Sequence, residues 1–374
     1  MKICFFGTYD KNYTSNKMIL KGFYENGLDV IEINSSIAVT KLTTSQEMSL
    51  FQLMLRVLRK YKIVTEIVRN FKKFIKTDVI YVGYPGHVDV FFAYPIAKLF
   101  RKKLIFNPLL IIYNGFADEQ GILGKKSILG AVIKTVESLC YRLCDMVFAD
   151  TPFQYDHLRK GFNIPSKKLR VLPIGADDTG YKYTKYTNTK SRKVHVVYYG
   201  LYSPVHGVEH IVEAANILKN DKNVSFSFVG QGNTFAENYK RIQKLKLKNI
   251  KFYHEVPESE HLPVMQSSDI FLGFLQKHPS VDRIIPNKVY QGLALGRVVL
   301  TADAPVTRSM FKHKKDMYLV KPADPQALAD AILELKSNPA LRTSIAKNGY
   351  KLYKEKFTPK AVVGLLVSYV KEII

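Results

Sequence analysis

Residues 285–300 read IPNKVYQGLALGRVVL and predict a helix followed at once by a buried strand. Pro286 is typical of the first turn of a helix, and Gly296 is the kind of residue that follows a helix end. The residues after Gly296, RVVL, form a short apolar run of the kind that a buried strand shows. A helix that leads straight into a buried strand is the repeating element of α/β proteins.

The same alternation extends in both directions along the chain. Short apolar runs, each followed by a helical pattern, recur on both sides of a polar stretch that ends at Lys193. They are Ile3–Gly7, Val30–Ile33, Val79–Gly83, Leu104–Phe106, Met146–Ala149, Val171–Ile174, Val194–Gly200, Phe226–Gly230, Ile250–Tyr253, Ile270–Phe274, Val298–Thr301 and Tyr318–Val320. We therefore predict an α/β protein with two parallel sheets, each covered by helices on both faces, and a ligand cleft between the domains at the carboxyl ends of the strands.

The spacing of these runs predicts how the chain is divided. Residues 1–176 form a first Rossmann-like domain, 177–193 a linker poor in apolar residues, and 194–354 a second Rossmann-like domain. Residues 355–374 contain an amphipathic helix with Pro359 early in its first turn, and we expect it to pack back on the first domain. A length of 374 residues agrees with two domains of ordinary size.

The composition is that of a folded protein with a strong positive charge. With 47% hydrophobic and 24% charged residues the chain is neither disordered nor collagen-like, and its 56 basic against 32 acidic residues leave a net charge of +24. Such a charge favours phosphates, nucleic acid or an anionic membrane as partners. The three cysteines are too few for a disulfide framework, and the sequence shows no signal peptide and no apolar run of about 18 residues. We therefore expect a cytoplasmic protein.

Basic residues concentrate between residues 51 and 76. Apolar residues recur there at helical spacing and are surrounded by Lys and Arg, which predicts one or two basic amphipathic helices. A surface helix with a solvated basic face and a helix that attaches to an anionic membrane both have this pattern. Nucleic acid is not expected, because no nucleic-acid-binding motif accompanies the charge.

The helix start at Pro286 is the strongest candidate for a binding site. The first turn of a helix carries unpaired backbone N–H groups and a partial positive charge, and Lys288 adds a full charge there. A lysine at this end of a helix is otherwise unfavourable, so we favour a diphosphate site over a solvated surface lysine. His206 and Gly207 precede another predicted helix, where His206 could hydrogen-bond phosphate or be a loop histidine without a ligand.

Two glycine turns and one histidine follow other predicted strands. Gly7-Thr8 and Gly230-Gln231-Gly232 would let a ligand approach the backbone, although a tight turn explains them as well and neither is a dinucleotide-binding fingerprint. His87, in GYPGHVDVF, lies at the corresponding mouth of the first domain, where a structural histidine is the common alternative.

At these residues the chain resembles the family-4 retaining glycosyltransferases, which have the GT-B architecture of two facing Rossmann-like domains. The segments that carry the resemblance are GTYDKNYTSNKMILKGFYENGLDV, DTPFQYDHLRKGFNIPSKKLRVLPIGAD, YGLYSPVHGVEHIVEAANIL, PNKVYQGLALGRVVLTAD and YLVKPADPQALADAILELKSNPALRTSIAKNGYKLYKEKF. The resemblance implies that the first domain binds the acceptor and the second domain binds a nucleotide-sugar donor.

Four positions depart from the family's pattern. The Arg and Lys that grip the donor diphosphate in the family are Leu201 and His206 here, and its two glutamates are Arg283 and Gln291. Arg283 and Lys288 supply cations near the same helix start, and Gln291 can hydrogen-bond a ribose hydroxyl. The donor-binding residues that we predict are Gly7, Thr8, His206, Gly207, Gly230, Arg283, Pro286, Asn287, Lys288 and Gln291.

The resemblance implies a hexosyltransferase that moves a sugar from a UDP- or GDP-sugar to a lipid-linked or glycan acceptor and retains its anomeric configuration. Candidates for catalysis in the first domain are His87, Asn114 and Asp118. We expect no cofactor and no metal, because cations of the protein would neutralise the leaving group. Attachment of the basic helices to the inner face of the cell membrane would suit surface polysaccharide assembly. A nucleotide-sugar epimerase of the same architecture and a non-catalytic sugar-nucleotide- or polyanion-binding protein are the alternatives.

Overall fold

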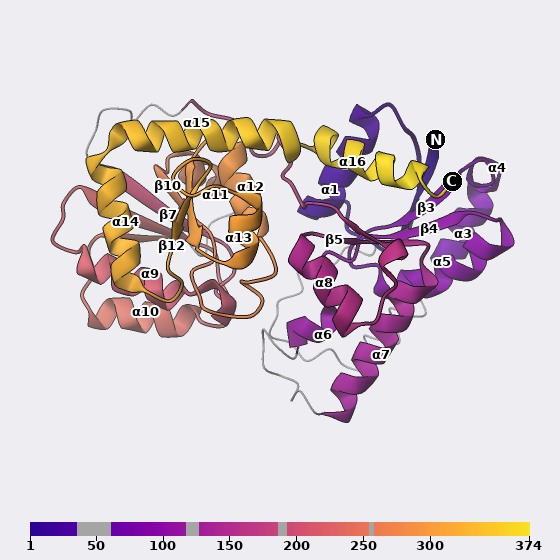
Figure 1. The fold of residues 1–374 in the computed structure, drawn as a ribbon, viewed down its shortest axis with the longest axis horizontal. Helices are drawn as coiled ribbons and strands as arrows, with labels where there is room; N and C mark the ends of the chain where they lie inside the picture. The colour runs from indigo at the N-terminus through magenta and orange to yellow at the C-terminus, as the bar shows by residue number, and fades with distance from the viewer. Residues whose placement is uncertain (36–60, 117–126, 186–192, 254–257) are drawn as a thin grey trace. The chain divides into compact units, whose positions relative to one another are not determined.

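The chain folds into two compact units, Met1–Ile174 with Pro359–Ile374, and Gly175–Thr358 (Figure 1). The computed structural model describes residues 1–35, 61–116, 127–185, 193–253 and 258–374. Each unit is built on a six-stranded sheet whose strands all pair in parallel. The predicted fold class, two parallel α/β sheets with flanking helices, is therefore confirmed.

The sheet of the first unit has the strand order β2-β1-β3-β4-β5-β6. Its strands are β1 (Lys2–Gly7), β2 (Asp29–Asn34), β3 (Val79–Val82), β4 (Lys103–Phe106), β5 (Met146–Ala149) and β6 (Leu169–Val171). Its helices are α1 (Thr14–Glu25), α3 (Tyr61–Arg69), α4 (Phe71–Phe74), α5 (His87–Leu99), α6 (Ile112–Asn114), α7 (Ile128–Leu143), α8 (Pro152–Gly161) and α16 (Pro359–Lys371), with a 3₁₀ turn at Ser166–Lys168.

Two hydrophobic clusters cover the two faces of this sheet. In β1, Cys4 and Phe6 face the cluster that includes α5 and α7, while Ile3 and Phe5 face the cluster of α1 and α16. Because successive strand residues point to opposite faces, a strand covered on both sides reads as a continuous apolar run. This is why β1 is buried at every position after Lys2.

Helix α16 returns from the end of the chain to the first unit and packs along α1. Val363 and Leu366 are fully buried there. Gly22 of α1 allows the close approach, because a Cβ at this position would lie 2.4 Å from the carbonyl oxygen of Pro359. The C-terminal helix is therefore part of the first unit's core.

The sheet of the second unit has the strand order β12-β11-β10-β7-β8-β9. Its strands are β7 (Val194–Tyr199), β8 (Val224–Val229), β9 (Ile250–Tyr253), β10 (Ile270–Leu272), β11 (Val298–Ala302) and β12 (Tyr318–Val320). Its helices are α9 (Val208–Ile217), α10 (Phe235–Lys244), α11 (Glu258–Gln266), α12 (Asn287–Ala294), α13 (Pro305–Met310), α14 (Pro325–Ser337) and α15 (Pro339–Lys356), with a 3₁₀ turn at Pro204–His206.

The described part of the polar stretch after residue 176 packs on the second unit. Tyr183 stacks on Tyr350 of α15 with ring centres 4.1 Å apart. The hydroxyl of Tyr181 accepts a hydrogen bond from Gln291 in α12. Residues 177–185 thus belong to the fold of the second unit.

Candidate functional site

The predicted helix from Pro286 to Gly296 is present as α12, and its first turn holds a buried lysine. Pro286 stands at the N-cap in an extended conformation, without a side chain that caps the helix. Lys288 is only 5% exposed, although it lies in the first turn. The interpretation of Lys288 as a solvated surface lysine is therefore wrong.

The ammonium group of Lys288 lies among a histidine and aromatic rings. Its Nζ is 3.3 Å from Nδ1 of His206, 4.3 Å from the ring centre of Tyr198 and 5.7 Å from that of Phe274. None of the described acidic residues forms an ion pair with Lys288. Burial alone lowers the pKa of Lys288 to about 7. A buried cation held without an anion is a group that an anionic ligand would stabilise.

His206 lies beside Lys288 as a neutral side chain. Its Nδ1 is 2.7 Å from the hydroxyl of Tyr198, which donates to the carbonyl oxygen of Leu201 at 2.5 Å. Burial, and then the charge of Lys288, hold the pKa of His206 well below its usual value. His206 is therefore uncharged near pH 7 and carries a single ring N–H. It can donate to a phosphate oxygen only in the tautomer that places this hydrogen on Nε2 and leaves Nδ1 to accept from Lys288.

Glycines bring the backbone of two loops close to this lysine. Gly200, after β7, has φ +138°, and a Cβ there would lie 2.9 Å from Nζ of Lys288. Gly230, after β8, has φ +121°, and a Cβ added there would overlap the carbonyl oxygen of Gly200. Gly207 has φ +69° and packs against the backbone of Gln276. Only glycine combines these φ values with such close contacts.

Gln291 lies one turn further along α12. Its Nε2 donates to the hydroxyl of Tyr181 at 2.9 Å. Its Oε1 is buried and has no hydrogen-bond partner among the described residues. Arg283 lies partly buried in the loop before α12, and Asn287 is the first residue of that helix. The structure thus brings Gly200, His206 and Lys288 together, with Gln291 on the same helix as the lysine.

The candidates in the first unit have partners within that unit. Nε2 of His87 lies 3.2 Å from Oε1 of Glu137, and both residues are buried. Asn114 is buried and its Oδ1 lies 3.0 Å from Nε2 of His157. Asp118 lies outside the described residues. The roles of these three residues in catalysis remain predictions.

The turn at Gly7 and Thr8 binds a carboxylate of its own unit. Thr8 donates its backbone N–H at 2.9 Å and its hydroxyl at 3.0 Å to Oδ2 of Asp89 in α5. A Cβ at Gly7, where φ is +134°, would lie 2.7 Å from the same oxygen. These contacts explain the glycine as a close approach within the fold, and a role in donor binding remains a prediction.

Two residues at strand ends were not predicted as site residues from the sequence. The ring centre of Tyr198 in β7 lies 4.3 Å from Nζ of Lys288. From the sequence alone, Tyr198 is only an aromatic residue within a predicted strand. Asp150, directly after β5, is buried with Oδ1 unpartnered among the described residues, and burial raises its pKa to about 7. An acidic residue that follows an apolar run was the available signal for Asp150.

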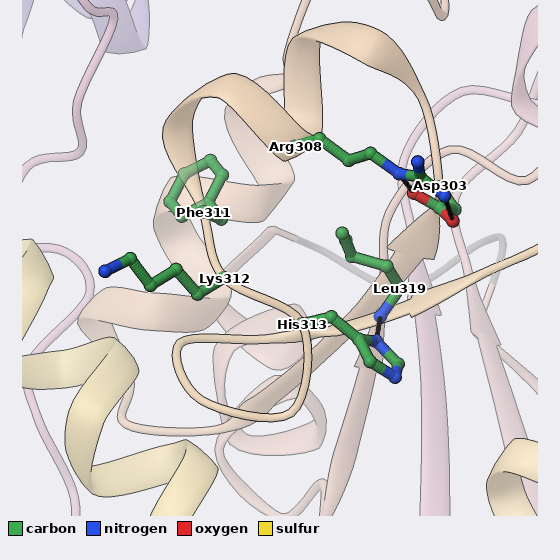
Figure 2. A pocket seen from close by; sticks show the side chains of 6 residues that line it. All are labelled: Asp303, Arg308, Phe311, Lys312, His313 and Leu319. Carbon is green, nitrogen blue, oxygen red and sulfur yellow. Dashed lines mark hydrogen bonds and ion pairs between the residues drawn. The ribbon is translucent and has the colours of Figure 1, made fainter.

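Two cavities lie elsewhere in the second unit. Figure 2 shows one of about 470 Å³, lined by Asp303, Arg308, Phe311, Lys312, His313 and Leu319. Arg308 pairs with Asp303, and Nδ1 of His313 accepts the backbone N–H of Leu319 at 3.0 Å. A neighbouring cavity of about 460 Å³ lies between α13 and α15. None of the predicted site residues lines either cavity, so neither is the predicted donor site.

Two negative findings concern the described part of the chain. No three residues of the types His, Cys, Asp and Glu come together there as metal ligands would. No described helix is long and apolar enough to cross a membrane.

Residues 182–352 match the family model described as Glycosyl transferases group 1. This segment includes β7 to β12 and the site around Lys288. No curated protein sequence matches the chain.

Several solved structures share the fold over nearly the whole chain. HepE of Anabaena, solved with UDP-glucose, is 15% identical with a TM-score of 0.69, and the alignment covers 100% of both chains. Sucrose-phosphate synthase of Thermosynechococcus elongatus is 14% identical with a TM-score of 0.69, covering 100% of this chain and 98% of the synthase. A glycosyltransferase of Rickettsia africae is 16% identical with a TM-score of 0.59, covering 95% of this chain and 87% of the other.

Fold and family model together define the class of the protein. The two parallel α/β units are those of the GT-B fold. Residues 182–352, a little under half of the chain, are similar to the group 1 glycosyltransferases, and this match together with the shared fold supports a glycosyltransferase.

Proposed function

We propose that this glycosyltransferase is a retaining enzyme of family 4 that transfers a sugar from a UDP- or GDP-sugar, with a lipid-linked or glycan acceptor. The observation that carries the proposal is Lys288, a buried lysine without an acidic partner among the described residues, in the first turn of α12. A diphosphate supplies the missing negative charge. HepE, which shares the fold, binds UDP and UDP-glucose, and this supports a uridine nucleotide as donor.

The proposed chemistry depends on charge at the leaving group. When the bond between the sugar and the diphosphate breaks, negative charge develops on the diphosphate oxygens. Protonated Lys288 and the backbone N–H groups of the first turn of α12 would stabilise that charge, and His206 would donate its ring N–H. Buried groups act strongly here because little water screens them. Oε1 of Gln291 would accept a hydrogen bond from a ribose hydroxyl.

The first unit is proposed to bind the acceptor and to assist through His87, Asn114 or Asp118. Arg69, Lys72, Lys73 and Lys76, on and directly after α3 and α4, are exposed. These four residues, called here the basic cluster, would attach the protein to anionic lipids at the cytoplasmic face of the cell membrane. A lipid-linked acceptor and a role in surface polysaccharide assembly would follow. We propose as well that the transfer reaction needs no metal ion.

The test is turnover of labelled donors by the purified protein in the presence of a membrane extract. We expect release of UDP or GDP together with labelled glycan. Lys288→Met should lower kcat/KM by about a hundredfold or more, as loss of a preorganised charge at a leaving group does. Lys312→Met, which removes an exposed lysine of the same unit, is the matched control.

Each part of the proposal has its own contradicting result. Full activity of Lys288→Met would exclude the diphosphate site. Conversion of free donor without transfer would indicate an epimerase, and binding without turnover a non-catalytic protein. An inverted anomeric centre in the product, read by NMR, would exclude the retaining assignment.

A further inference from the structure

The outer side of α7 exposes a continuous apolar surface. Ile128 is 85% exposed, and Leu129, Val132, Val136 and Leu139 are each 49–58% exposed. These residues recur at helical spacing along one side of α7, while Cys140 and Tyr141 on the other side are fully buried in the core. Scattered apolar residues are normal on a protein surface, but a contiguous stripe usually marks a binding surface.

Helix α5 packs beside α7 and adds to this surface. The two helices meet where Nε2 of His87 contacts Glu137 and the thiol of Cys140 donates to the carbonyl oxygen of His87. Both pack on the same face of the sheet, through Val90 of α5 and Tyr141 of α7. On the outer side of α5, Val88 is 49% and Leu99 is 76% exposed. The outer sides of α5 and α7 together are called here the apolar face.

The exposed charges of α5 and α7 are of one sign, and nearby Arg69 of the basic cluster pairs with Glu66 at 2.9 Å. The acidic residues of α5 and α7 are Asp89 and Glu137, and both are buried and hydrogen-bonded inward, to Thr8 and to the backbone of α6. The exposed charged residues of these two helices are Lys98 and Arg142. The basic cluster of α3 and α4 lies on the same side of the sheet, since Phe74 of α4 belongs to the same hydrophobic cluster.

From this arrangement we infer that the apolar face inserts into the interfacial region of an anionic bilayer. Exposed apolar side chains bordered by lysine and arginine are what a helix lying in the interface presents to lipid. A second copy of the chain fits less well, because each copy carries the same basic border and a net charge of +24. The inference rests on the proposed membrane attachment and adds an apolar contact to the basic cluster.

The chain contains no tryptophan, so one introduced tryptophan reports on a single position. Val136→Trp places it on α7, where the side chain it replaces is 49% exposed. With vesicles of phosphatidylcholine and phosphatidylglycerol we expect its emission to shift to the blue, and lipids brominated in the acyl chain to quench it. Ile217→Trp, at a 45% exposed position on α9 of the second unit, is the control and should show neither effect.

A pair of charge substitutions measures the contribution of the apolar face to binding. Val132→Glu combined with Val136→Glu should weaken binding to these vesicles by about tenfold or more, since partial burial of two such side chains corresponds to that factor. Ile217→Glu combined with Leu365→Glu makes the same charge change at exposed positions on other faces and should leave binding unchanged. High salt should remove the contribution of the basic cluster and leave that of the apolar face.

These experiments distinguish insertion of the apolar face from membrane attachment through the basic cluster. If the parent protein does not bind anionic vesicles, the proposed membrane attachment fails. If it binds, but Val136→Trp shows no blue shift and the Val132/Val136 variant binds equally well, attachment holds and insertion of the apolar face is overturned. If instead the parent is a dimer that this variant dissociates, and Val136→Trp is buried without lipid, the face is an interface between copies.

Discussion

Because burial lowers the pKa of Lys288, this one residue should make the free energy of unfolding depend on pH. In the unfolded chain this lysine keeps its proton up to about pH 10.5, but in the folded chain only up to about pH 7. Between these values the unfolded state binds more protons, so the free energy of unfolding rises with pH through this window. Below pH 7 the whole cost of the buried charge is present.

Lys288→Met should therefore stabilise the protein most below pH 7, and the gain should disappear toward pH 10.5. We expect on the order of 2 kcal/mol, less than the pKa shift alone implies, because the contact of the ammonium with the ring of Tyr198 is lost as well. Urea unfolding at several pH values measures this. A gain that is independent of pH would contradict a charged, buried Lys288.

The same lysine should couple donor binding to protons. Near pH 7 a diphosphate that binds the charged form draws a proton onto Lys288, so affinity for UDP or GDP should fall as the pH rises above 7. Calorimetry in buffers of different ionisation enthalpy should show proton uptake with the parent protein. Lys288→Met should lose that uptake, while uptake that persists there would point to His206 instead.

The two glycine turns after β7 and β8 should differ in how well they tolerate replacement of glycine by alanine. Gly200→Ala brings a Cβ against the flexible end of Lys288, whereas Gly230→Ala brings it against the backbone oxygen of Gly200. We expect Gly200→Ala to cost about 1–3 kcal/mol of stability and to weaken UDP binding by displacing the lysine, and Gly230→Ala to cost more.

Gly27→Ala is the matched control for these two turns. Gly27 also has a positive φ of +69°, but nothing lies within 4 Å of an added Cβ. Gly27→Ala should lower the free energy of unfolding by about 1 kcal/mol, because alanine disfavours this backbone conformation. It should leave UDP binding unchanged. Equal costs at Gly27, Gly200 and Gly230 in denaturant unfolding would show that close approach contributes nothing.

The stability of the first unit depends on the last helix of the chain, α16, because that helix contributes buried residues to its core. Leu366 of α16 is fully buried against α1 and β1, whereas its neighbour Leu365 is 37% exposed. Leu366→Ala in the full chain should lower the stability of the first unit by about 3 kcal/mol through the cavity it leaves. Leu365→Ala should change it little, and UDP binding by the folded second unit should be unaffected by either.

Calorimetric unfolding of the full chain measures this difference. If both leucine variants unfold like the parent, the packing of α16 on α1 does not contribute to the stability of the first unit. If Leu366→Ala also weakens UDP binding, the second unit depends on the C-terminal helix as well.

The fold was predictable because its signals are local. The run Val194–Gly200 and the helix between Pro286 and Gly296 are specified by neighbouring residues, through burial on both sheet faces and through helix start and stop residues. The helix start at Pro286 was predicted as an anion site for the same reason. Tyr198 was not found, because its contact with Lys288 joins residues far apart in the sequence. Asp150 directly follows an apolar run, and this local pattern could have indicated it.

Residue type and spacing over a few turns were enough to predict the succession of strands and helices along the chain, the positive charge and the candidate helix start. The folded structure was needed to find that Lys288 is buried beside His206 and Tyr198, that Thr8 is bound to Asp89, and that α7 leaves its outer side exposed. A pKa, a hydrogen-bond partner and an exposed fraction are set by every atom that surrounds a side chain, and those atoms come together only when the chain folds.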